Sequence, residues 1–144
     1  MNNLELLGFV VDCLSTLLAA TAILIYIHFW IKDKRINSYN VFDSLYQDIL
    51  KTGLEYPQFR NPEKTKDYKN SFSEDQLIQY EIYAFMCWNF CETVYDKKDK
   101  RLMRTWLVVL EEERNLHLQW IYQPENERKF KPEFILYIKQ AVHE

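Results

Sequence analysis

The sequence predicts an all-α protein in which one N-terminal transmembrane helix is followed by an antiparallel four-helix cytoplasmic bundle. Three observations support this prediction. The 19 residues from Cys13 to Ile31 carry no charge. Apolar residues recur at helical spacing in four later segments. The chain of 144 residues also has two glycines and four prolines, too few for a β fold that depends on tight turns.

The uncharged segment has the length and the flanks of a membrane span. As a helix it is roughly 28 Å long, close to the hydrocarbon thickness of a bilayer. Tyr26, Phe29 and Trp30 near its end are typical of an interfacial aromatic belt. All 18 Lys and Arg residues lie at or after Lys32, so the positive-inside rule places the N-terminus outside and the C-terminus in the cytoplasm. We therefore expect a single-pass protein of the bacterial inner (cytoplasmic) membrane.

Two other interpretations of this segment remain open. A cleaved signal peptide would begin with a basic region, and no basic residue precedes Lys32. A buried helix of a soluble protein is the second alternative, although such helices rarely extend this far without a charge. The membrane span is the interpretation that we follow.

The expected domain boundaries follow from this placement. The chain divides into a transmembrane anchor at residues 1–31, a basic juxtamembrane linker at 32–37 and a cytoplasmic helical domain at 38–144. The helices expected in the domain cover residues 38–54, 74–96, 100–122 and 132 onward. Ser73 and Gln76 form a capping box before the second helix, whose middle is apolar on nearly all sides. We expect residues 56–72 to form a polar loop, and Trp88 and Trp106 to be buried between the second and third helices.

Small and polar side chains fall on one face of the span. This face consists of Asp12, Ser15, Thr16, Ala19 and Ala22. Small residues let membrane helices approach closely, and acids within membranes usually face protein or water. We interpret the face as a self-association seam. The alternative is that the acid merely lies in the outer headgroup region.

Basic residues are predicted to gather at two levels of the domain. If its first helix leads away from the membrane, the loop after the second helix is near the membrane, and the loops after the first and third helices are distal. The basic residues expected to face anionic lipid are Lys32, Lys34, Arg35, Lys97, Lys98 and Arg101. The distal set, expected to bind an anionic ligand or a partner, is Phe59, Arg60, Lys64, Lys66, Arg128, Lys129 and Lys131. The alternative is a solvated polar end that nearby acids partly balance.

The sequence offers little catalytic chemistry. Cys87 and Cys91 lie one helical turn apart and could hold a metal with His117, but buried reduced thiols are the favoured interpretation. Glu111 to Glu113 are expected to form a solvated shoulder. The sequence has no phosphate-binding glycine loop, no nucleophile elbow and no zinc-protease helix. We therefore predict no catalytic residue, no metal and no cofactor.

The stretches EYPQFRNP, YAFMCWNFCETVYD and KPEFILYI, together with Trp106, resemble small bacterial single-span membrane proteins of unknown function. In these proteins a short helical domain follows the anchor. The resemblance covers Tyr46 to Ile138. It implies the architecture and supplies no activity.

The expected function is that of a non-enzymatic, membrane-anchored interaction module. It would self-associate through the span as a homo-oligomer, contact membrane lipid and bind a cytoplasmic protein partner. From Lys32 onward the chain has 18 basic and 19 acidic residues, which argues against general nucleic-acid binding. The alternative is a membrane effector, as in bacterial anti-phage systems, whose cytoplasmic domain senses a ligand and whose clustered spans perturb the bilayer.

Overall fold

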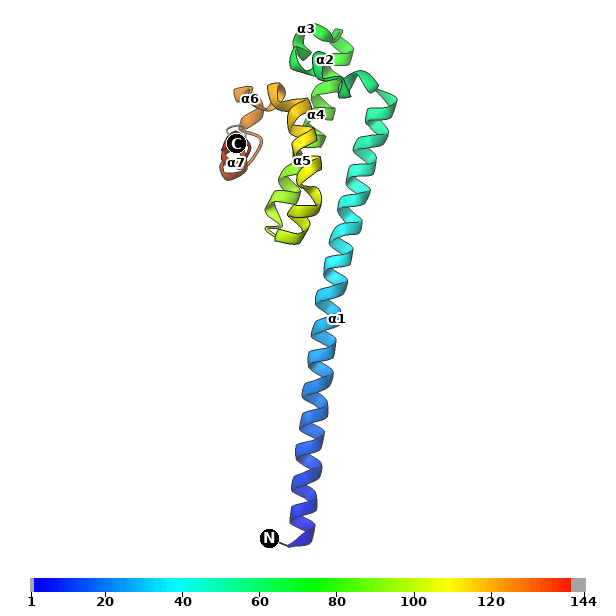
Figure 1. The fold of residues 1–144 in the computed structure, drawn as a ribbon, viewed down its shortest axis with the longest axis vertical. Coiled ribbons are helices and arrows are strands. Elements are labelled where there is room, and N and C mark those ends of the chain that lie inside the picture. Colours follow the sequence, from blue (N-terminus) through cyan, green and yellow to red (C-terminus); the bar gives the residue numbers. More distant parts are fainter. Residues whose placement is uncertain (1, 141–144) are drawn as a thin grey trace. The chain divides into compact units, whose positions relative to one another are not determined.

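The computed structural model describes residues 2–140, without the side chains of residues 3–5, and this part of the chain contains helices and no strand (Figure 1). The helices are α1 (Asn3–Glu55), the 3₁₀ helix η1 (Pro57–Arg60), α2 (Pro62–Lys66), α3 (Tyr68–Ser71), α4 (Glu74–Asp96), α5 (Lys100–Ile121), α6 (Pro124–Glu127) and α7 (Pro132–Gln140). The prediction of an all-α protein is confirmed for these residues. The end of the expected domain, at 141–144, lies outside them.

Helix α1 continues without a break through residues 32–37, which we expected to form a linker. The prediction of a separate helix beginning at Ser38 is wrong. The segment KDKRINS has no glycine or proline, and its long charged side chains are compatible with a helix. Ser38 does not cap a new helix, because its hydroxyl donates to the carbonyl oxygen of Lys34 at 3.0 Å within the existing one. The chain nevertheless divides into two compact units between Asn40 and Val41, described separately below.

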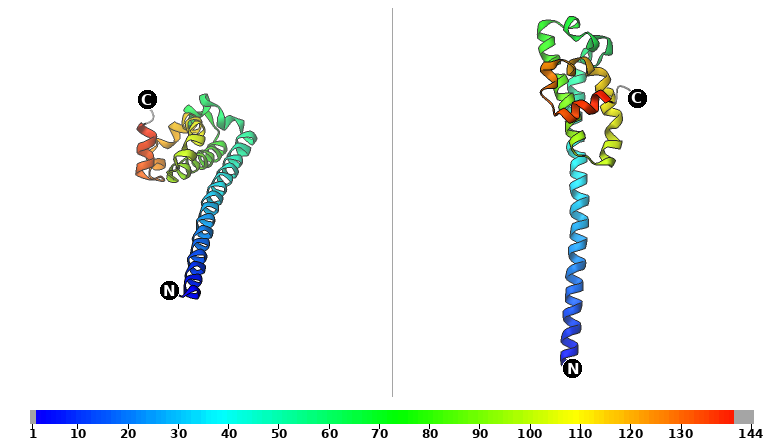
Figure 2. Two further views of the ribbon diagram at one scale, coloured as in Figure 1. Left: turned by 60° about the horizontal axis from the view of Figure 1, so that its bottom comes forward. Right: turned by 90° about the vertical axis from the view of Figure 1, so that its left-hand side faces the viewer.

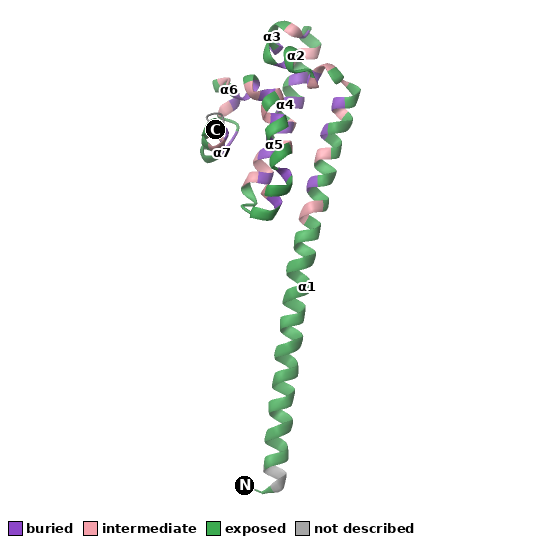
Figure 3. Cartoon of the chain, in the orientation of Figure 1, coloured by how far each residue is buried: buried purple, intermediate pink, exposed green. Residues whose placement is uncertain are grey.

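The first unit, which ends at Asn40, contains the apolar part of α1, whose large side chains are exposed (Figure 3). Leu17, Leu18 and Leu24 are 67%, 70% and 67% exposed. The described residues contain this one helix that is long and apolar enough to cross a membrane, judged by length and composition. None of its most apolar stretch is buried, whereas the core helix of a soluble protein would be mostly buried.

The second unit is built around α4 and α5, which lie side by side in Figures 1 and 2. Ser73 caps α4: its hydroxyl accepts from the backbone N–H of Gln76 at 3.4 Å, and the Gln76 side chain accepts from the N–H of Ser73 at 3.3 Å. The predicted capping box is therefore confirmed. Asp99 caps α5 by accepting from the N–H groups of Arg101 and Leu102. These caps fix where both helices begin.

Aromatic side chains fill the space between α1, α4 and α5. Phe42 of α1 is 1% exposed and meets Phe90 and Trp106 edge-on, with ring centroids 6.2 and 6.4 Å apart. The prediction that both indoles are buried is confirmed, since Trp88 is 0% and Trp106 6% exposed. Trp88 donates its indole N–H to the carbonyl oxygen of His117 at 3.1 Å, where α5 is kinked. This bond ties α4 to the kink.

The predicted polar loop at residues 56–72 is wrong, because this segment folds into η1, α2 and α3. Asn61 caps α2 through its side-chain oxygen. Phe59 and Phe72 are buried against Tyr80 of α4, with ring centroids 5.6 and 4.9 Å apart. The aromatic residues of this segment thus anchor it to the core, although its prolines and charges are typical of a loop.

Helix α7 closes the described chain. Pro132 lies in its first turn, as predicted. Phe134 and Ile138 are buried, and the Phe134 ring meets the indole of Trp88 with centroids 6.1 Å apart. The last helix therefore covers α4 on the side of Trp88.

Although the middle of α4 is apolar on nearly all sides, one apolar face of this helix is exposed. Ile78 and Ile82 are each 58% exposed and Phe85 is 39% exposed. Their spacing of four and three residues places them on one face, which we call the α4 stripe. Together with Glu81 and Lys129 they line a shallow groove. Within residues 2–140 no element covers this face of α4.

Candidate functional site

The most polar part of the core is a set of interacting side chains that we call the Glu113 cluster: Tyr46, Arg60, Tyr83, Glu113 and His117. Helix α5 places Glu113 and His117 one turn apart on the face that packs toward α4, and both are 0% exposed. Our prediction that Glu113 belongs to a solvated shoulder is wrong. Glu111 and Glu112 do face solvent.

One carboxylate oxygen of Glu113 collects two donors. Arg60 donates from Nη1 to Oε1 at 2.8 Å, and the Tyr46 hydroxyl donates to the same oxygen at 3.1 Å. The Arg60 guanidinium also donates to the hydroxyl of Tyr83 at 3.0 Å. Three segments far apart in sequence, α1, η1 and α5, therefore meet at one carboxylate oxygen.

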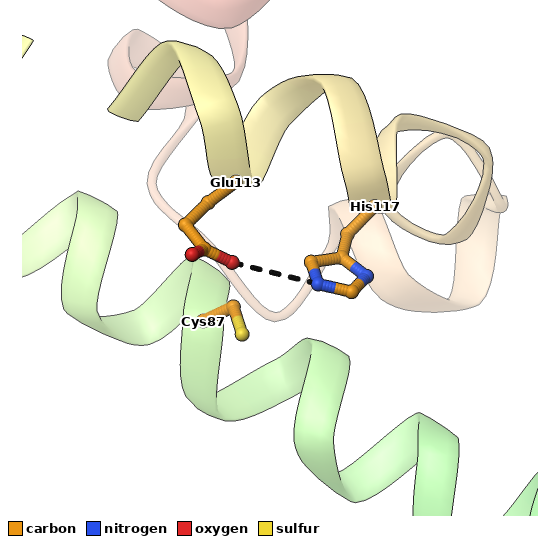
Figure 4. A group of neighbouring side chains, drawn as sticks. All are labelled: Cys87, Glu113 and His117. Atoms are coloured by element: carbon orange, nitrogen blue, oxygen red, sulfur yellow. Dashed lines mark ion pairs between the residues drawn. The ribbon is translucent and has the colours of Figure 1, made fainter. Parts of the chain in front are cut away.

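The second carboxylate oxygen faces His117. Oε2 of Glu113 lies 3.5 Å from Nε2 of His117, too far for a good hydrogen bond, and neither atom has another partner among the described residues (Figure 4). The other ring nitrogen, Nδ1, lies 3.1 Å from the hydroxyl of Tyr80. The imidazole is thus oriented by one hydrogen bond and leaves Nε2 directed at the carboxylate.

The charges of the cluster follow from burial and from these contacts. Burial alone would raise the pKa of Glu113, but His117 and Arg60 lower it to about 2, so the carboxylate is ionised. Burial lowers the pKa of His117, so the imidazole is neutral at pH 7. The core therefore holds one carboxylate paired with one guanidinium that is 23% exposed.

Gly53 of α1 makes room for this pair. A Cβ atom at this position would lie 2.7 Å from Cδ of Arg60 and 2.9 Å from the hydroxyl of Tyr83. Both distances are shorter than any ordinary contact, and both side chains are held by the hydrogen bonds described above. Glycine is therefore the residue that lets Arg60 pass α1 on its way to Glu113.

The cluster also contains candidate metal ligands. Cys87 of α4, Glu113 and His117 each offer one donor atom, and these three atoms lie within 4.8 Å of one another. Figure 4 shows Glu113 and His117 of α5 facing one another, with Cys87 of α4 beside them between the two helices. Cys87 is a free, buried thiol, and burial raises its pKa well above 9.0. A protonated and inaccessible thiol is a poor nucleophile, so the arrangement does not favour covalent catalysis.

The structure does not gather the predicted distal basic set into one surface. Phe59, expected as an aromatic contact for a ligand, is 1% exposed, and Arg60 is engaged with Glu113. Lys131 pairs with Asp96 at the end of α4. The other residues of the predicted distal set are exposed: Lys64, Lys66, Arg128 and Lys129. Lys129 also lies over the ring of Trp120 at 5.0 Å.

The residues predicted to contact lipid or to associate are exposed. Around the connection between α4 and α5 these are Lys97, Lys98 and Arg101; on α1 they are Lys32, Lys34, Arg35, Asp12, Ser15, Thr16, Ala19 and Ala22. The two groups belong to different units of the chain. Their common position at a membrane surface stays a prediction.

The Glu113 cluster left one signal in the sequence that our interpretation overlooked. Glu113 follows Leu110 by three residues and precedes His117 by four, so it lies on the apolar stripe of α5 and not beside it. An acid on a buried stripe requires a basic partner. No sequence signal identifies Arg60 as that partner, because it lies 53 residues away in a segment that resembles a loop.

Comparison with known proteins finds no matching family model, and no curated protein or solved structure matches the chain. The resemblance to small bacterial single-span proteins therefore stays a prediction.

Proposed function

We propose that the protein is a non-enzymatic, single-pass anchor of the bacterial inner membrane that presents a helical interaction domain to the cytoplasm. The observation that carries this proposal is the apolar part of α1, whose large side chains are exposed along its length. Exposed apolar surface costs about 25 cal/mol per Å² in water. A lipid bilayer removes that cost for a helix of this length, with N-terminus outside and basic residues inside.

The polar side chains of the span also suit a membrane. The hydroxyls of Ser15, Thr16 and Thr21 each donate to the carbonyl oxygen four residues earlier, all at 2.8 Å. Hydroxyls that are satisfied within their own helix do not need water, so they can lie in hydrocarbon or in a helix–helix contact. This supports the proposal that the segment with Ser15, Thr16 and Thr21 lies within a bilayer.

The domain after the span is proposed to act by binding a cytoplasmic protein. We propose that it is organised as an antiparallel four-helix bundle, because a short turn joins α4 to α5 and short connections produce antiparallel neighbours. The α4 stripe is the surface that best fits a partner. Apolar side chains at positions i, i+4 and i+7, bordered by Glu81 and Lys129, match an amphipathic helix that carries one basic and one acidic residue beside its apolar face.

Self-association through the span is tested by changing one small residue. Ala19→Leu should reduce the yield of cross-linked oligomer from native membranes, because a bulky side chain separates helices that attract one another by close packing. Leu24→Ala lies off the proposed seam and serves as the control, with little expected change. Equal oligomer yield from Ala19→Leu and wild type would leave a monomeric tether.

Partner binding is tested by a photo-activated cross-linker placed in the full-length protein in cells. A cross-linker at Ile82 should give one discrete adduct with another protein, because this position lies in the centre of the α4 stripe. A cross-linker at Val108, which is 61% exposed on α5 and does not line the groove, is the matched control and should give no such adduct. An adduct of two identical chains, or equal adducts at both positions, would contradict a partner at the α4 stripe.

A further inference from the structure

We propose that Cys87, Glu113 and His117 form a zinc-binding site at the contact between α4 and α5. The three side chains come from two helices and are each 0% exposed. One donor atom from each lies within 4.8 Å of the other two (Figure 4). This proposal is independent of the membrane anchor and of the partner.

The distances suit a small tetrahedral ion. Zinc–ligand bonds of about 2.0–2.3 Å place neighbouring ligand atoms about 3.3–3.8 Å apart. Nε2 of His117 and Oε2 of Glu113 are already 3.5 Å apart. All three donor atoms lie within 4.8 Å of one another, so bringing the Cys87 sulfur to zinc distance requires a shift of about 1.5 Å or less, which a side-chain rotation can supply.

Two buried polar atoms at this point, Oε2 of Glu113 and Nε2 of His117, face each other at 3.5 Å, beyond a good hydrogen-bond distance, and neither has another hydrogen-bond partner among the described residues. Buried polar atoms of a folded protein nearly always have a partner, and an unsatisfied one costs free energy. A cation between them would satisfy both at once. The long Glu113–His117 contact is therefore a geometric observation, beyond the residue types, that supports a bound ion.

The surrounding contacts leave these donor atoms free and orient them. Arg60 and Tyr46 occupy the other carboxylate oxygen, Oε1, so they do not compete for Oε2. The hydroxyl of Tyr80 lies 3.1 Å from Nδ1 of His117 and can donate to it or accept from it. Without metal the ring proton lies on Nε2 and faces Glu113; on zinc binding the proton is carried by Nδ1 and is accepted by Tyr80, which leaves the lone pair of Nε2 for the metal. Metal-bound histidines commonly have such a partner on the second nitrogen, because it fixes the ring and its tautomer.

The chemistry of the donors selects the ion. A thiolate, an imidazole and a carboxylate are the ligand types of zinc, whereas calcium and magnesium prefer oxygen alone. Three protein ligands suffice for zinc when water completes the tetrahedron. Binding replaces the thiol proton of Cys87 by the metal, and that proton leaves to solvent. The sequence allows Cys87 as a metal ligand with His117 but favours a reduced core thiol, and Glu113 is the ligand that the sequence does not indicate.

The experiment measures zinc in the full-length, reduced protein purified in detergent, and then replaces zinc with cobalt. We expect about one zinc per chain, and a thiolate-to-cobalt charge-transfer band after exchange. Cys87→Ser should lose the band and the zinc. Cys91→Ser is the matched control, since Cys91 is also 0% exposed and lies one turn along α4, outside the group of three donors. This variant should retain both.

A second variant keeps the test decisive if Cys87→Ser does not fold. Tyr80→Phe removes one hydroxyl and keeps the ring, and it should weaken zinc binding about 10–100-fold through loss of the bond to Nδ1. Wild-type protein without zinc and without a cobalt band would overturn the proposal. So would a band of equal intensity in Cys87→Ser, or an unchanged zinc affinity in Tyr80→Phe.

Discussion

Replacing Glu113 with alanine is expected to lower the free energy of unfolding of the helical domain by about 3–5 kcal/mol. The carboxylate is fully buried and receives hydrogen bonds from Arg60 and Tyr46. Its removal leaves the guanidinium without its counter-ion in the core. Arg60 is 23% exposed, so water can reach part of the charge, and the lower part of this range is expected. Chemical unfolding followed by tryptophan fluorescence measures the change.

The control for this variant is its neighbour in sequence. Glu112→Ala removes an exposed carboxylate and should change the free energy of unfolding by no more than about 0.5 kcal/mol. Equal effects of Glu112→Ala and Glu113→Ala would show that all three glutamates face solvent. The Glu113 cluster would then be wrong.

The same carboxylate predicts an acid-dependent loss of stability. Burial alone would raise its pKa, but His117 and Arg60 lower it from 4.5 to about 2. Between these pH values the unfolded chain binds a proton that the folded chain does not. The stabilisation is therefore complete above about pH 4.5 and is lost as the pH falls toward 2. Glu113→Gln cannot titrate and should lack this part of the acid dependence.

Replacing Trp88 with alanine is expected to cost about 3–5 kcal/mol, enough to unfold a marginally stable domain. The indole is 0% exposed and lies between α4, α5 and α7. Alanine would leave a cavity and would also remove the donor that bonds to the carbonyl oxygen of His117 at 3.1 Å. Thermal unfolding monitored by far-ultraviolet circular dichroism measures the loss.

Two control variants show whether the loss of stability comes from the buried volume of Trp88 or from any substitution in the domain. Trp88→Phe retains most of the apolar volume and should be clearly more stable than Trp88→Ala. Leu136→Ala changes a residue that is 56% exposed and should have a small effect. A folded Trp88→Ala protein with wild-type stability would contradict the packing of α4 against α5.

The features that could be predicted are those set by local sequence. Helix α4 begins and ends where its capping box and apolar spacing place it, and α7 begins at Pro132 as its sequence predicts. Trp88 and Trp106 are buried as expected, because large aromatic residues on an apolar stripe have few other positions available. Local propensity and periodicity suffice for such features.

Other features depend on contacts between distant segments. The basic run at residues 32–37 is typical of the end of a membrane span, but nothing in it stops a helix, so α1 continues. Phe59 and Phe72 turn a segment that resembles a loop into part of the core, because Tyr80 of α4 lies within reach. Spacing within one segment cannot reveal such partners.

The candidate site was the least predictable part. Arg60 was grouped with other basic residues by its charge, yet its guanidinium turns inward to Glu113. Lys131 was grouped with the same residues by its loop, yet it pairs with Asp96 at the other end of α4. In both residues the direction of the side chain determines the ion-pair partner. The grouping of charged residues along the sequence does not indicate in which direction a side chain points.

The central claim is that the chain crosses a membrane once and places its helical domain in the cytoplasm. The most direct measurement fuses reporters to the C-terminus of the full-length protein in a bacterial host. A reporter that is active in the cytoplasm should be active in the membrane fraction, and one that is active in the periplasm should be silent. Activity of the periplasmic reporter, or release of the intact fusion into the soluble fraction, would contradict the claim.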